Sequence, residues 1–342
     1  MKLTVEPITL KLGTPFHIAH GVSVARDSVL VHLENGVGEG AIMPYYDYTQ
    51  TDVVAYLENL DIDRVLVEGP LMLEDALDRL PPGPSPALNA IDIALHDFWA
   101  KQLGYPLYRL WGLNPKDTPP TSVTVSITED ETEFKQRLRA KKDFPIIKLK
   151  LGTGDLAADE EIVRVAHAET RSLLCVDANS AWRVAEAAQI IPKLAAYDRL
   201  LFIEQPLPRE DVQDWHRLRA LLPPKMPPLI ADESVQNSGD ILALAGGADG
   251  INIKLTKAGG LREARRMITL ARTLGMKVML GCSIESSVGI TAAVHLAPLV
   301  DYADLDGNLD VVNDPYIGAV MEKGYFRYPV TPGLGVTRRR EV

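Results

Sequence analysis

Eight short apolar runs recur between residues 121 and 304 and constrain the fold of this chain more than any other feature. Each run has the length of a β-strand, and the segments between runs are long enough for one helix. Helical patterns at 160–170 and 261–275 fill two of these segments. Strands that alternate with helices form parallel sheets, and eight of them predict a closed (β/α) barrel. The runs are 121–126, 145–151, 173–177, 200–204, 228–232, 249–253, 277–281 and 300–304.

The same alternation also occurs in open, doubly wound sheets. Such a fold binds phosphate at a Gly-rich turn after its first strand, but the segment SVTVSITEDETE at 122–133 contains no glycine. The glycine pairs Gly246-Gly247 and Gly259-Gly260 are instead expected in turns. A barrel is therefore the predicted architecture, and a chain of 342 residues leaves room for an appended domain.

The residues that precede the barrel have a different pattern. A helix is predicted over 85–104, because apolar residues recur at helical spacing between the early Pro86 and Gly104. Asn35-Gly36 predicts a hairpin turn between two strands. Three strands are expected here, at 2–12, 26–34 and 37–43. This part of the chain is therefore expected to form a mixed α and β unit.

The composition narrows the class of partner and the location. A net charge of -10 argues against a nucleic acid or an anionic membrane surface as partner. It leaves room for metal cations and for a cationic group on a small substrate. Two cysteines are too few for a disulfide framework, so a reducing cytoplasm is expected. The N-terminus lacks the apolar core of a signal peptide, and no apolar stretch is long enough to cross a bilayer.

Two lysines stand in the second apolar run, FPIIKLKLG at 144–152. Lys148 and Lys150 are two residues apart, so on a strand their side chains point to the same face. Burying two adjacent ammonium groups is costly, and each favours the neutral form of the other. A fold accepts that cost where a neutral amine serves as a base. The alternative for these two residues alone is a surface strand with solvated lysines.

Three consecutive strands end in carboxylates, which belong to Asp177, Glu204 and Asp232. Neighbouring parallel strands lie about 4.8 Å apart, so the three carboxylates can converge on one point. They could not all stay ionised there without a cation. Oxygen ligands with no histidine or thiolate beside them select Mg²⁺ or a similar hard ion. Further polar residues stand beside or near these strand ends, namely Asn179, Gln205 and Asn252.

Lys254 ends the sixth strand and is expected across the metal from Lys150. A carboxylate bound to Mg²⁺ would present its α-carbon between the two lysines. The metal would act as a Lewis acid that stabilises an enediolate when the α-proton leaves. One lysine could then remove the proton and the other return it, which inverts the stereocentre. Lys257, three residues further on beside Ala258-Gly259, is expected in a loop.

With these motifs the chain resembles the enolase superfamily, in its muconate-lactonizing-enzyme subgroup. The likeness covers essentially the whole chain and rests on Lys-x-Lys, VDAN, IEQP, ADES and NIKL taken together. It implies an α+β capping domain over 1–118, a modified TIM barrel of the (β/α)₇β type over 119–310, and a segment 311–342 that returns to the cap.

The resemblance also implies roles for the site residues. It implies one Mg²⁺ per subunit bound by the three strand-end carboxylates, with Asn179, Gln205 and Asn252 behind them. It implies Lys150 and Lys254 as paired acid/base catalysts, with Lys148 assisting Lys150. A homo-oligomer is expected on the same ground.

Asp304 and Asp306 discriminate within the subgroup. They are similar to the pair with which dipeptide epimerases, the alanyl-glutamate epimerases among them, hold the substrate's α-ammonium group. Two carboxylates in a pocket favour a cation, and a free dipeptide offers one at its N-terminus. Thr124 and Cys282 are further candidates for substrate contact, and barrel filling is the alternative for both.

Side-chain specificity is expected in two loops of the cap, at 15–25 and 45–55. The first has His20-Gly21 where an arginine for alanyl-glutamate is expected, and Arg26 lies further along, at the start of the strand expected over 26–34. The second contains three tyrosines and Asp47. Its composition favours hydrophobic or cationic dipeptides, and packing of the tyrosines against the barrel is the alternative.

The function predicted from the sequence is therefore a Mg²⁺-dependent epimerase that inverts the C-terminal residue of a dipeptide. An o-succinylbenzoate synthase, an N-acylamino acid racemase or a cycloisomerase of the same subgroup is the alternative. The substrates of those enzymes lack an α-ammonium group, so Asp304 and Asp306 argue against them. A non-catalytic binding or scaffold protein is disfavoured, because it has no need to bury the lysines.

Overall fold

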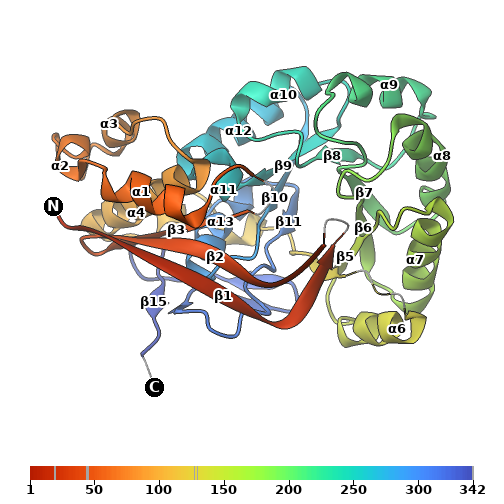
Figure 1. The fold of residues 1–342 in the computed structure, drawn as a ribbon, viewed down its shortest axis with the longest axis horizontal. Coiled ribbons are helices and arrows are strands. Elements are labelled where there is room, and N and C mark those ends of the chain that lie inside the picture. The colour runs from red at the N-terminus through yellow and green to blue at the C-terminus, as the bar shows by residue number, and fades with distance from the viewer. Residues whose placement is uncertain (19–20, 44–45, 127, 129, 341–342) are drawn as a thin grey trace.

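The computed structural model describes the whole chain except residues 19–20, 44–45, 127, 129 and 341–342, and for 16–22 it describes no side chains. Figure 1 shows a layered N-terminal unit beside a barrel whose helices lie on its outside. The first unit contains an antiparallel sheet with the strand order β1-β2-β3. Its strands are β1 (Leu3–Ile18), β2 (Gly21–Leu33) and β3 (Gly36–Ala41).

A long helix, α4 (Ser85–Leu103), covers one face of this sheet. It ends at Gly104, whose φ of 77° is readily available only to glycine. The helix lies so close to β3 that a Cβ on Gly38 would stand 1.9 Å from the carbonyl oxygen of Ala90. The predicted helix over 85–104 and the hairpin at Asn35-Gly36 are confirmed. Shorter helices complete the unit, namely α1 (Gln50–Glu58), α2 (Ile62–Val65) and α3 (Leu73–Asp78).

The second unit is an eight-stranded parallel sheet whose strand order follows the chain. A parallel bridge between Thr121 and Ala303, supported by a 2.9 Å hydrogen bond from Ser122 N to Ala303 O, joins its first and last strands. The sheet is therefore closed, and all eight predicted strands are confirmed. The strands are β4 (Val123–Val125), β5 (Ile146–Lys150), β6 (Leu173–Asp177), β7 (Leu200–Glu204), β8 (Leu229–Ala231), β9 (Gly250–Lys254), β10 (Lys277–Gly281) and β11 (Tyr302–Asp304).

Helices connect consecutive strands of the barrel and pack their apolar faces on its outside (Figure 1). They are α6 (Glu131–Ala140), α7 (Leu156–Glu169), α8 (Val184–Leu194), α9 (Gln213–Leu221), α10 (Ser238–Leu244), α11 (Leu255–Ala258), α12 (Leu261–Thr273) and α13 (Ser287–Val294). The last strand, β11, follows α13 and a 3₁₀ turn, η2 (Ala297–Leu299). Seven strand-helix units and a final strand give the expected (β/α)₇β arrangement.

Contacts with the start of α13 and with the C-terminal segment hold the N-terminal unit in place. Glu39 on β3 accepts hydrogen bonds from the backbone N–H groups of Ser286 and Gly289, at the start of α13. From the C-terminal segment, Arg338 pairs with Glu6 at 2.8 Å. The remaining elements are α5 (Leu107–Leu110), η1 (Pro115–Asp117), β12 (Tyr316–Ile317), β13 (Val320–Glu322), β14 (Tyr325–Arg327) and β15 (Thr337–Arg338). Across the described part of the chain, no helix combines the length and apolar character needed to cross a membrane.

Candidate active site

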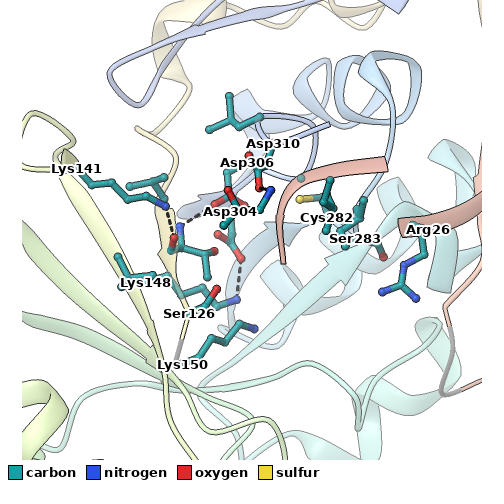
Figure 2. Close-up of a pocket in the computed structure, with 18 of the residues that line it drawn as sticks. Arg26, Ser126, Lys141, Lys148, Lys150, Cys282, Ser283, Asp304, Asp306 and Asp310 are labelled. Atoms are coloured by element: carbon teal, nitrogen blue, oxygen red, sulfur yellow. Dashed lines mark hydrogen bonds and ion pairs between the residues drawn. The ribbon is translucent and has the colours of Figure 1, made fainter. Parts of the chain in front are cut away.

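A cavity of about 560 Å³ opens at the carboxyl ends of the barrel strands, beneath the N-terminal unit. Side chains from both units line it: Lys148, Lys150 and Lys254 from the barrel, and Leu12 and Arg26 from strands of the cap. The carboxyl ends of barrel strands are where reactive groups of this fold gather. Figure 2 shows Lys141, Asp306 and Asp310 toward one side of this pocket and Arg26 on the other.

Lys148 and Lys150 line the pocket, and each contacts carboxylates that lie behind the lining, those of Asp177 and Glu204. Lys150 Nζ lies 2.7 Å from Asp177 Oδ2, which is its cross-strand neighbour. Lys148 Nζ lies 2.7 Å from Glu204 Oε2 and 3.2 Å from Asp177 Oδ2. Asp177 and Glu204 are paired in register on β6 and β7. The structure therefore brings both predicted strand lysines against two of the predicted metal ligands.

The third carboxylate, Asp232, is held between two further lysines. Lys254 Nζ lies 2.7 Å from Oδ2 of Asp232, and Lys257 Nζ lies 2.5 Å from Oδ1. The expectation of a loop position for Lys257 is wrong. This residue lies in the one-turn helix α11 and is 5% exposed. Its spacing of three from Lys254 is one helical turn, which folds its side chain back toward the end of β8.

Asp304 and Asp306 lie side by side but have different partners. Asp304 accepts a 2.7 Å hydrogen bond from Lys148 (Figure 2). It accepts a second one, of 2.6 Å, from the hydroxyl of Ser122. Asp306 accepts a 2.7 Å hydrogen bond from the backbone N–H of Thr124. Ser122 escaped the sequence reasoning, although it precedes Thr124 by two residues and alternation alone places both on one face.

The charges of the site shift several pKa values strongly. For Asp177, burial raises the pKa, but Lys150 and Lys148 outweigh it and lower the value to about 2. For Glu204, burial and the charge of Asp177 raise the pKa to about 8, against the effect of Lys148. For Lys148, burial lowers the pKa, but Asp304, Glu204 and Asp177 raise it well above its ordinary value. The pKa of Lys148 is therefore raised, whereas the charge of its neighbour Lys150 alone would lower it.

The carboxylates are supported from behind by the three expected amide residues. Gln205 Oε1 accepts a 2.8 Å hydrogen bond from the backbone N–H of Asp232. Asn252 donates a 2.7 Å hydrogen bond to Oε1 of Glu204. Asn179 lines the pocket, and its backbone N–H donates to Asp177 at 2.9 Å. Each amide residue therefore contacts one residue of the predicted ligand set, Asn179 and Asn252 through a carboxylate and Gln205 through the backbone of Asp232.

The three carboxylates have the chemistry of a hard-metal site. Within the described residues, Oε2 of Glu204 and Oδ2 of Asp232 are buried and accept no hydrogen bond of good geometry, although a lysine ammonium lies 2.7 Å from each. Carboxylate oxygens in this condition suit a Mg²⁺ ion. Lysine ammonium groups stand between the carboxylates, and the described chain holds no group of three His, Cys, Asp or Glu side chains arranged to bind a metal.

The cap side of the pocket differs in part from expectation. Arg26 belongs to β2 and also lines the cavity, where Figure 2 shows it extending from a cap strand near Ser283. The second-loop residues Tyr46 and Tyr48 are not among the pocket-lining side chains, and Tyr46 lies under the guanidinium of Arg209. The expectation at His20-Gly21 falls outside the residues whose side chains are described.

Other predicted contacts do reach the pocket. Thr124 and Cys282 both line it, and burial raises the pKa of the Cys282 thiol well above its usual value. Lys141, which no sequence motif singles out, lines the pocket and donates a hydrogen bond to the carbonyl of Thr124. Ser283, the residue after Cys282, also lines the pocket.

Comparison with family models identifies the class of protein that this fold and site define. Residues 2–112 match the model described as the mandelate racemase / muconate lactonizing enzyme N-terminal domain, and residues 130–342 match the one described as enolase C-terminal domain-like. The chain belongs to this family, within the enolase superfamily, and the expected family is confirmed.

Among individual proteins, the chain is similar to several dipeptide epimerases. It is 38% identical to the L-Ala-D/L-Glu epimerase of Bacteroides thetaiotaomicron, over 99% of this chain and 88% of that protein. It is 35% identical to an L-Ala-D/L-amino acid epimerase of a Maribacter species, over 98% and 99%. The crystal structure of a dipeptide epimerase from Methylococcus capsulatus, complexed with Mg and the dipeptide L-Arg-D-Lys, matches with a TM-score of 0.86. That match has 31% identity and covers 98% of each chain.

Proposed function

We propose that the protein is a Mg²⁺-dependent epimerase that inverts the α-carbon of the C-terminal residue of a dipeptide. The observation that carries this proposal is the placement of Lys150 and Lys254 on separate strands of one pocket, each ion-paired to a different strand-end carboxylate. The dipeptide epimerases among the chain's relatives support the same activity. The two free cysteines, Cys175 and Cys282, support a reducing compartment such as the cytoplasm.

The proposed reaction is a transfer of one proton off the α-carbon and one proton onto it. A lysine in the neutral amine form accepts the α-proton through its Nζ lone pair, and the carbon becomes planar. The other lysine, as an ammonium group, donates a proton to the opposite face. Lys150 and Lys254 exchange these two roles when the reaction runs in the other direction.

Asp177, Glu204 and Asp232 are the residues that would hold Mg²⁺. When bound, the ion supplies a Lewis acid that stabilises negative charge on the substrate carboxylate. Lys148, held by three carboxylates, keeps its proton and contributes a fixed positive charge beside Lys150. A fixed cation at that position favours the neutral form of its neighbour.

The α-ammonium group of the substrate is assigned to Asp304 and Asp306. Asp304 is already engaged by Lys148 and Ser122, whereas Asp306 accepts a hydrogen bond from one backbone donor, Thr124 N, within the described part of the chain. Burial and the charge of Asp304 raise the pKa of Asp306. A cation beside Asp306 would relieve that repulsion, so we assign it the main contact and Asp304 the supporting one.

For the side chains of the substrate we propose hydrophobic or cationic dipeptides. The apolar lining residues Leu12, Met43 and Ile284 support the first, and the acidic Glu233 and Asp310 support the second. Arg26 favours a second candidate, a dipeptide with an acidic C-terminal side chain, because a guanidinium in the pocket wall pairs with a carboxylate.

Isotope exchange with a dipeptide library in D₂O and Mg²⁺ tests the function. We expect one deuteron to enter the C-terminal residue, where tandem mass spectrometry locates it. We expect this exchange to be fastest with dipeptides that carry hydrophobic or cationic side chains. Faster exchange with acidic C-terminal residues, lost in Arg26→Ala, would favour the second candidate. No exchange with any dipeptide, together with turnover of an o-succinylbenzoate precursor or of an N-acylamino acid, would overturn the epimerase assignment.

A further inference from the structure

Lys257 is a fully buried ammonium group that the proposed proton transfers do not use. It is not among the side chains that line the pocket, and its side chain is 1% exposed. Its three N–H donors match three acceptors: the carbonyl of Asp232 at 2.6 Å, Oδ1 of Asp232 at 2.5 Å and the carbonyl of Asn252 at 3.2 Å. A lysine with every donor engaged and no contact with the cavity is not placed to move a substrate proton.

These acceptors lie where the β8–β9 ladder has ended. The two strands pair at Ile230–Gly250 and Ala231–Ile251 and no further. Asp232 and Asn252 would form the next pair. Lys257 binds a carbonyl of each, so its ammonium group continues the connection between the strands beyond the backbone hydrogen bonds.

The same contacts divide the oxygens of Asp232. Oδ1 is bound to Lys257, and Oδ2 faces Lys254 at 2.7 Å. Lys254 itself stands two residues after Asn252, on the strand that Lys257 ties to Asp232. The position of one catalytic lysine relative to one predicted metal ligand therefore depends on Lys257.

We propose that Lys257 is a positioning residue, which fixes Asp232 and Lys254 relative to each other so that proton transfer at Lys254 is aligned. This inference rests on the proposed two-base epimerisation. A misplacement of about 1 Å can slow an enzymatic step on the order of 100-fold. The rate should fall at the step in which Lys254 transfers the proton, because Lys150 stands on β5 and is paired with Asp177 on β6, away from the contacts of Lys257 with Asp232 and Asn252.

The first test measures positioning without catalysis. Lys257→Met and wild type are compared by hydrogen-deuterium exchange of the full chain in EDTA, read in peptides that cover 229–236 and 250–258. We expect exchange at least about tenfold faster in these two peptides only. Lys101→Met is the matched control, because Lys101 also pairs with a buried carboxylate, Asp97 at 2.7 Å, away from the pocket.

The second test determines which of the two proton transfers is slowed when Lys257 is replaced. In D₂O, each stereoisomer of the dipeptide either exchanges its α-proton with retention or is inverted. With Lys257→Met we expect the ratio of retention exchange to inversion to rise at least about tenfold for the isomer deprotonated by Lys150, and not for the other. Lys254→Ala identifies that isomer, because it retains exchange with it alone.

The outcomes separate this inference from the proposed function. No exchange in the wild-type protein would overturn the epimerase assignment itself. Exchange in wild type with an unchanged ratio in Lys257→Met, or unchanged protection of both peptides, would overturn the positioning role. If Lys257→Met does not fold, Lys257→Gln keeps two N–H donors without the charge. If the ratio of retention exchange to inversion rises in Lys257→Gln, but by less than about tenfold, the result supports positioning by hydrogen bonds. An unchanged ratio contradicts it.

Discussion

Replacing Lys148 by methionine removes the cation that three buried carboxylates share. Its Nζ lies 2.7 Å from Asp304 Oδ2, 2.7 Å from Glu204 Oε2 and 3.2 Å from Asp177 Oδ2, and its side chain is 3% exposed. Removing one partner from a buried ion pair costs about 3–5 kcal/mol, because the remaining charge is left uncompensated. Glu204, with its pKa raised to about 8, is mostly protonated at pH 7 and ionised at pH 9, so the substitution leaves less repulsion behind at pH 7. We therefore expect a loss of about 3 kcal/mol at pH 7, and a larger one at pH 9.

The assay is urea unfolding in EDTA, followed by circular dichroism at both pH values. Mg²⁺ added at 100 times its dissociation constant should return about 2.7 kcal/mol, because a bound ion stabilises the folded state by mass action. Lys101→Met is the control, since its pair with Asp97 lies outside the pocket. Mg²⁺ should stabilise this variant as much as it stabilises wild type, so the stability difference between the two should be the same with and without Mg²⁺. Equal stability of Lys148→Met and wild type in EDTA would refute the electrostatic reasoning.

Three further predictions follow from other contacts. Asp306→Asn should raise KM for a dipeptide about 10- to 100-fold in a steady-state assay with little change in kcat, because a charged hydrogen bond is worth about 1.5–3 kcal/mol; an unchanged KM would remove Asp306 from substrate binding. Burial, against a hydrogen bond to the carbonyl of Leu334, lowers the pKa of His295 to about 4. The unfolded chain therefore takes up this proton first, and the free energy of unfolding should fall by about 3 kcal/mol between pH 6.5 and pH 4. His295→Gln should flatten that decline in urea titrations, and a parallel decline would contradict it. Gly38→Ala would place a Cβ 1.9 Å from the oxygen of Ala90, and urea unfolding should show a loss of about 1–3 kcal/mol or more; wild-type stability would show that α4 moves without cost.

Most of the fold could be predicted from the sequence because barrel strands are buried on both faces. Segments such as 200–204 are short, apolar and bounded by turns, so each can be recognised as a strand from its own residues alone. The extent of β1 and β2 could not be predicted in the same way. These strands continue to Ile18 and from Gly21, well beyond the predicted limits at 12 and 26, into segments that contain glycine and proline and whose pairing is a tertiary property. The domain limits at 118 and 310 stay predictions.

The site residues that could be predicted from the sequence are those that stand at the end of a barrel strand. Asp177 and Lys254 close their strands, so the fold alone brings them to the barrel mouth. Lys257 was misplaced because a short helix, rather than a loop, follows β9 and folds the side chain inward. Arg26 was predicted to belong to a strand, but only the packing of the cap over the barrel places its guanidinium in the pocket wall. The chemical roles of these residues stay predictions.

The central claim is that two lysines act on opposite faces of one carbon, and a paired isotope experiment tests it most directly. Lys150→Ala and Lys254→Ala are each incubated in D₂O with Mg²⁺ and both C-terminal stereoisomers of one dipeptide substrate. We predict that neither variant inverts the substrate. Each should still exchange the α-proton of one stereoisomer, and the two variants should choose opposite isomers. Inversion by either variant, or exchange of the same isomer by both, would contradict a two-base site.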